Sequence, residues 1–184
     1  MKELAFCDIS LADKLARFGA KVTRALPFAD LGDLRQTMAS DTTLLQGDLA
    51  DFRRAADNVR LAQLGSLLCA SVLADAWSPE GTAIIGLNGD GCAHNNRQFW
   101  DDFLAHGRDT GRASLFVPTL PSIPACEAAI ALGVHGAVRY LKTVDKTQTS
   151  ELLAEMFASD SQLRQIMTIE ISAVGATIHL LGRE

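Results

Sequence analysis

Apolar residues recur along the N-terminal third of the chain at a spacing of three or four, which is typical of helices. Leu11, Leu15 and Phe18 follow Ser10 and Asp13, and these two polar residues have the form of a helix capping box. The pattern predicts a helix over 10–19. Residues 20–46 give no clear period, apart from a short helix expected near 33–39.

A longer helical pattern runs from Asp48 to Ala76. Its second half is apolar nearly all round, which indicates a buried helix. Its first half carries polar residues opposite the apolar ones, among them Arg53, Arg54 and Arg60. The break comes at the Ser-Pro-Glu-Gly sequence of residues 78–81.

Beyond residue 81, strand and helix patterns alternate. Expected strands cover 82–87, 136–144, 165–172 and 176–181, the last two as a hairpin. Expected helices cover 95–105, 124–132 and 145–158, with Gly133 as the C-terminal cap of the second and an irregular connection over 107–122. This alternation predicts an α/β fold, a mixed sheet flanked by helices, with an additional helical region at the N-terminus.

Composition narrows the class of protein. The chain has 184 residues, enough for one domain over 1–184, and 48% hydrophobic with 21% charged residues is globular composition. Its net charge is −5 and no Lys/Arg run is present, so neither nucleic acid nor an anionic membrane is an expected partner. No apolar run reaches the roughly 18 residues of a membrane helix, and no signal segment opens the chain. We therefore expect a cytoplasmic protein.

Two glycine- and cysteine-containing segments invite a cofactor or metal interpretation. Residues 86–91 follow a strand, but their spacing is Gly-x-x-Gly-x-Gly, which is not the dinucleotide-binding pattern. Cys92 and His94 could supply two metal ligands, whereas a zinc site needs at least three from the protein. His106, His135 and His179 show no ligand spacing relative to them. We therefore expect no cofactor and no metal.

Further candidate chemistry lies in the C-terminal half. Cys126 sits near a helix N-terminus, which lowers a thiol pKa, and could pair with His135 as a thiolate–imidazole pair. Cys126 also falls among small alanines, where a buried packing role is the favoured interpretation. Asp145 and Gln148 form a plausible capping box, which by itself indicates only a helix start.

Residues 58–140 resemble the N-terminal half of the β-ketoacyl synthases, the thiolase-fold condensing enzymes of fatty-acid and polyketide synthesis. Four passages carry the resemblance: 58–65, 82–91, 96–100 and 113–133, with Gly136 closing the last. The last of them, ASLFVPTLPSIPACEAAIALG, resembles the short "ketoacyl synthase N-terminal-like" branch in particular. The resemblance implies a single thiolase-like half. Residues 1–45 match nothing in the family and remain unassigned.

The same resemblance argues against a condensing reaction. The family's nucleophile is a cysteine on the turn after the next strand, and counting from Gly136 places that position near Asp145. Residues 145–150 read Asp-Lys-Thr-Gln-Thr-Ser and contain no thiol. The family's two catalytic histidines lie in the C-terminal half of its fold, and the chain reaches Glu184 before that half begins.

The leading hypothesis is therefore a non-catalytic ketosynthase-like protein of a type II fatty-acid or polyketide pathway. It would form a homodimer, pair with a true ketosynthase, or bind an acyl carrier protein. Because a sheet edge mediates dimers in this family, segments 165–172 and 176–181 are the expected interface. Two alternatives stay open: a residual acyltransferase or thioesterase using Cys126, or Cys92 with His94, and a module that binds an acyl ligand without chemistry.

Overall fold

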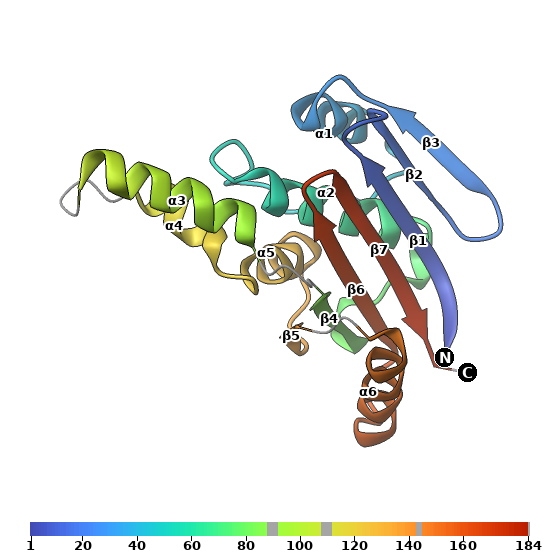
Figure 1. Ribbon diagram of the computed structural model, residues 1–184. Coiled ribbons are helices and arrows are strands. Elements are labelled where there is room, and N and C mark those ends of the chain that lie inside the picture. The colour runs from blue at the N-terminus through green and yellow to red at the C-terminus, as the bar shows by residue number, and fades with distance from the viewer. Residues whose placement is uncertain (88–91, 108–111, 143–144, 184) are drawn as a thin grey trace.

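A computed structural model describes residues 1–87, 92–107, 112–142 and 145–183. Its centre is a seven-stranded mixed sheet in the order β3-β2-β1-β7-β6-β4-β5 (Figure 1). The strands are β1 (Lys2–Ser10), β2 (Leu15–Gly19), β3 (Thr23–Pro27), β4 (Thr82–Leu87), β5 (Val138–Leu141), β6 (Gln165–Ser172) and β7 (Gly175–Gly182). The helices are α1 (Leu31–Ser40), α2 (Asp57–Ser71), α3 (Ala93–His106), α4 (Ala113–Phe116), α5 (Ile123–Leu132) and α6 (Lys146–Ser159), with 3-10 turns η1 (Ala74–Ala76), η2 (Pro79–Gly81) and η4 (Val117–Thr119).

The expected helix over 10–19 is wrong, because the N-terminal segment forms the antiparallel strands β1, β2 and β3. Ser10 Oγ does accept a hydrogen bond from the Asp13 amide, as in a capping box, and its hydroxyl donates to the Asp13 carboxylate, but these bonds close the turn between β1 and β2. Such side-chain bonds stabilise turns as well as helix starts. The strand signal in β1 is the alternation of Ala5, Cys7 and Ile9, all buried.

The helices of the first half form where expected, though with different bounds. α1 confirms the short helix near 33–39, and Asp30 caps it by accepting a 2.9 Å hydrogen bond from the Asp33 amide. The predicted helix over 48–76 shortens to α2, which starts at Asp57; residues before it form turns. α2 is buried on nearly every side, as its apolar sequence predicts.

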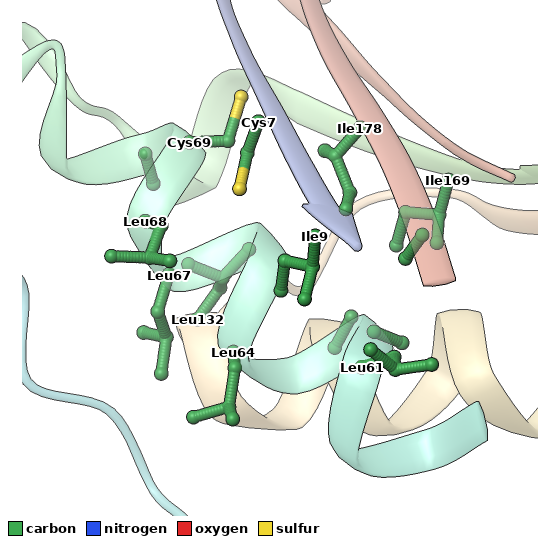
Figure 2. Packing of buried hydrophobic residues seen from close by; sticks show 14 of the residues in the cluster. Cys7, Ile9, Leu61, Leu64, Leu67, Leu68, Cys69, Leu132, Ile169 and Ile178 are labelled. Atoms are coloured by element: carbon green, nitrogen blue, oxygen red, sulfur yellow. The ribbon is translucent and has the colours of Figure 1, made fainter. Parts of the chain in front are cut away.

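The main core lies between the sheet and α2. Leu61, Leu64 and Leu68 of α2 belong to the same buried cluster as Ile9 of β1 and Ile178 of β7, and Figure 2 shows Ile9 and Ile178 between the strands and this helix. Gly65 permits this close approach, since a Cβ atom there would lie 2.4 Å from Ile178 Cδ1. α5 packs against α2, and the two helices contact every strand of the sheet except the exposed edge strand β3.

The C-terminal half follows the expected alternation. β4 pairs in parallel with both β5 and β6, and all of its residues except the last are buried. α5 ends at Gly133, whose left-handed conformation (φ 66°, ψ 27°) confirms the predicted cap. α6 covers the opposite face over β4 and β6, where Leu153 and Phe157 join Ile85 and Ile166 in a second core.

β6 and β7 form the predicted antiparallel hairpin, but neither is a sheet edge. β7 pairs on its other side with β1, and β6 pairs with β4. The expectation that 165–172 and 176–181 form the open interface is therefore wrong, because it left the N-terminal strand out of the sheet. The edges are β3 and β5.

The helices of the described residues were compared with the length and apolar composition that a membrane-spanning helix needs. No single helix there is long and apolar enough to cross a bilayer. The segments Ala113–Thr119 and Ile123–Leu132 reach that criterion only as a pair, and they meet at a 96° bend.

Candidate functional site

The carboxyl end of β5 leads into α6, the position at which the resemblance places a nucleophile. Asp145 is the N-cap of α6 and accepts a 2.8 Å hydrogen bond from the Thr147 amide through Oδ1. The Thr149 hydroxyl donates to the Asp145 carbonyl over 3.0 Å. Residues 143–144 lie outside the described part. The group at this helix start is thus a hydrogen-bond acceptor that stabilises the helix, and it offers no thiol to an acyl thioester.

Cys126 and His135 are not brought together. Cys126 lies in the first turn of α5 and is partly buried, whereas His135 is exposed beyond the Gly133 cap at the other end of the helix. At a rise of about 1.5 Å per residue, the six residues from Cys126 to the end of α5 at Leu132 span roughly 9 Å along the helix axis, and His135 lies beyond that end. A direct thiolate–imidazole pair needs hydrogen-bond distance, so this geometry favours the packing role for Cys126.

Cys92 and His94 line a pocket of about 470 Å³ at the carboxyl ends of β4 and β6. Cys92 is 8% exposed and precedes α3, and Asn58 Nδ2 lies 3.8 Å from its Sγ. His94 is exposed on the first turn of α3. The rest of the lining is mixed, with apolar side chains, amide and hydroxyl groups, and the charged side chains of Arg54 and Asp57. Most of the glycine segment 86–91, its residues 88–91, lies outside the described part.

Metal binding finds no support among the described residues, where no group of three or more His, Cys, Asp or Glu side chains is close enough to hold an ion.

An open groove of about 1030 Å³ lies between α1 and the turns before α2, and no motif in the sequence predicted it. Arg35 of α1 and Arg60 of α2 place their guanidinium carbons 5.1 and 5.4 Å from the centre of the Phe52 ring, and Arg53 joins them at the rim. Arg60 pairs with Asp57 over 3.3 Å. Three arginines thus gather in space although no basic run exists in the sequence. The polar face around Arg53 and Arg60 was the available signal.

Burial changes the acidity of a few groups outside this groove. Desolvation raises the pKa of the Cys7 and Cys69 thiols, which lie side by side in the main core (Figure 2). Desolvation, with smaller contributions from Asp51 and Asp48, raises the pKa of Glu127 on α5. The two thiols are structural, because a neutral buried thiol is a poor nucleophile.

The comparisons with known proteins bear on the fold. No protein-family model matches the chain, and no curated protein does. Among solved structures, it is similar to a chain from the complex of the ketosynthase ApeO with its chain length factor ApeC from Xenorhabdus doucetiae, with a TM-score of 0.56 at 16% identity. The fold is ketosynthase-like. The alignment covers 76% of this chain but only 63% of the other, slightly less than two thirds of its length.

The ketosynthase-like fold corrects one part of the expected architecture and supports another. The mixed sheet with helices on both faces agrees with the thiolase-like half that the resemblance implied. The additional N-terminal region is not helical throughout as expected, because the three strands β1, β2 and β3 precede the single helix α1.

Proposed function

We propose that this chain is a ketosynthase-like protein of a fatty-acid or polyketide pathway that lacks condensing activity of its own and acts as the partner of a ketosynthase in the cytoplasm. The observation that carries the proposal is Asp145. The family resemblance places the nucleophile at the start of the helix after β5, and at the start of α6 the N-cap residue is Asp145, a carboxylate. A carboxylate there cannot form the acyl thioester on which condensation depends.

The edge strand β5 is the surface proposed for the partner. In the described part of the chain no strand pairs with its outer side. The Ile84 amide donates to the Ala137 carbonyl, and Val138 is the register partner of Ile84. In a parallel ladder this directs the Val138 N–H away from β4 and toward the open edge. The other edge, β3, ends in Pro27, a residue that blunts strand addition.

Mixing the chain with ketosynthases encoded in the same genome tests the proposal. Light scattering after size exclusion should show a one-to-one complex with one of them, and Val138→Pro should weaken that complex while Val138→Thr, which keeps the N–H, should not. The chain alone should give no product and no acyl adduct by intact mass with acyl-carrier thioesters. A covalent acyl adduct on Cys92 or Cys126 would instead establish the residual-enzyme alternative.

The arginine groove favours a second partner, an acyl carrier protein. Its lining includes apolar residues such as Leu31 and Phe52, and three arginines outnumber the two carboxylates of Asp30 and Asp57. Basic rims steer and orient acidic protein surfaces. Arg53→Glu should weaken binding of an acidic carrier about tenfold or more at low salt, whereas Lys21→Glu, in the turn before β3, should leave it unchanged. Equal binding by both variants would remove this second candidate.

A further inference from the structure

α3 contributes no residue to either hydrophobic core. None of its residues is buried, and its neighbours are α4 and η4, with which it extends away from the sheet (Figure 1). Phe99, Trp100, Phe103 and Phe116 form an aromatic cluster, with ring centres 5.5–6.1 Å apart along its contacts. None of them belongs to the two cores of the sheet. We call α3, α4 and η4 together the arm. The aromatic cluster holds the elements of this arm to one another.

Much of the apolar surface of this arm faces solvent. Leu104 is 76% exposed and Trp100, one turn before it, is 54% exposed. Phe116, Val117 and Leu120 on α4 and the following residues are each more than 40% exposed. Exposed large apolar side chains gathered on one small arm of a protein indicate a contact with another molecule.

The charges beside Trp100 indicate what that molecule is. Arg97 and Asp101 are both exposed, four residues apart on the same helix, and within the described residues neither forms an ion pair. The neighbouring Asp102, in contrast, already lies 3.3 Å from His106 and 3.5 Å from Arg112. An antiparallel copy of α3 carries the same two charges in reverse order, so this stretch of helix is complementary to itself.

We propose that α3 pairs antiparallel with α3 of a second copy of this chain, around a twofold axis at Trp100. With that axis, Arg97 lies opposite residue 103 of the second copy, two residues from its Asp101. Two residues correspond to about 3 Å of helix rise, which an arginine side chain spans. The pairing gives two reciprocal ion pairs around an apolar centre of two tryptophans, as an isologous interface requires. The pairing uses none of the residues of β5.

Charge reversal in the full-length chain tests the pairing. Light scattering or sedimentation over a wide concentration range should show a dimer of the 19.7 kDa chain. Arg97→Asp and Asp101→Arg should each weaken it about tenfold or more, because each places two like-charged pairs at the axis. Mixing the two variants should restore association, since each then meets opposite charges. The double variant R97D/D101R should also dimerise like the natural chain.

Rescue between the two variants is specific to the antiparallel pairing of α3. Both positions are exposed, so circular dichroism should be unchanged in every variant. A natural chain that stays monomeric at several hundred micromolar would overturn the proposal, and so would variants that weaken the dimer but fail to rescue one another. Val138→Pro should leave this self-association intact. The Arg97 and Asp101 variants thus test the pairing of α3, and Val138→Pro tests ketosynthase binding at β5, so that a failure of one proposal is distinguished from a failure of the other.

Discussion

Glu127 shows how packing acts on one titratable residue. It lies on α5 facing α2, where Gln63 Nε2 is 3.3 Å from its Oε2. Gln63 Oε1 is buried and has no hydrogen-bond partner in the described structure. Burial, helped by Asp51 and Asp48, raises the pKa of Glu127 because the charged form is disfavoured. A neutral side chain at this position would suit the α2–α5 contact better than a carboxylate.

The pH dependence of Glu127 follows from the direction of that shift. A carboxyl whose pKa is higher in the folded state stabilises the fold below its unfolded pKa and loses that contribution as pH rises through the folded pKa. Glu127→Gln should therefore become more stable than the natural chain as pH rises from 4 to 7.5, by a few tenths of a kcal/mol because the side chain is part-exposed. Urea unfolding at several pH values measures this. The exposed control Glu151→Gln should show no such trend, and a trend of opposite sign would contradict the assignment.

At the scale of elements, α6 is tied down at both ends. Asp145 caps its first turn. Arg183, just after β7, donates to the carbonyls of Phe157 and Asp160 at its last turn, and its guanidinium carbon lies 5.8 Å from the centre of the Phe157 ring. A basic group at the C-terminal end of a helix satisfies carbonyls that the helix itself cannot. Hydrogen bonds from outside its own backbone ladder thus stabilise both ends of α6.

Substitution of the cap measures this structural role. Asp145→Ala should lower the free energy of unfolding by about 1 kcal/mol, because the Thr147 amide loses its acceptor. Asp145→Asn keeps an acceptor oxygen and should cost a few tenths of a kcal/mol at most. Chemical denaturation of the three proteins gives the comparison. If the Asn and Ala variants lost the same stability, the carboxylate charge and not the cap would be the feature that matters.

Sequence patterns predicted most elements after residue 57, because helices such as α5 and strands such as β4 have strong, local signals. The failures have a shared cause. Leu11 in the turn after β1 fits a helical period with Leu15 and Phe18 of β2 by chance, while the alternation of Ala5, Cys7 and Ile9 in β1 was short. Pairing of β1 with β7 joins residues about 170 apart, and no local pattern encodes that. The wrong sheet edge followed from the missed strand.

The features of the candidate sites also divide into those that local sequence predicted and those that depend on the fold. Asp145 as a helix cap was readable from its neighbours, whereas the separation of Cys126 from His135 required the bounds of α5. For the arginine groove the sequence offered only the polar face around Arg53 and Arg60, because Arg35 comes from α1 and meets Arg53 only through the fold. Sites made by one element were therefore accessible to sequence reasoning, and sites made between elements were not.

At the scale of the whole molecule, the two halves of the sheet are covered differently. The parallel half around β4 is buried on both faces, by α5 and by α6. Over β1 and β7 the second face carries polar pairs instead, with Thr177 donating to Asp8 and His179 beside Glu3. This is the usual division, since antiparallel sheets tolerate water on one face and parallel sheets do not. The main core under α2 therefore holds both halves together.

The alkylation rates of the cysteine thiols measure how often that core opens. Cys7 and Cys69 are fully buried between β1 and α2, whereas Cys126 is partly exposed. Alkylation of the native chain by iodoacetamide, followed by peptide mass spectrometry, should label Cys126 first. Cys7 and Cys69 should react only through opening of the core, so their labelling rates should rise with urea along the slope of global unfolding, while that of Cys126 stays nearly flat. Cys126→Ser provides the control that removes the fast phase. Labelling of Cys7 as fast as Cys126 without urea would mean that β1 opens independently, and the N-terminal strands would then be a separate, weaker unit of the fold.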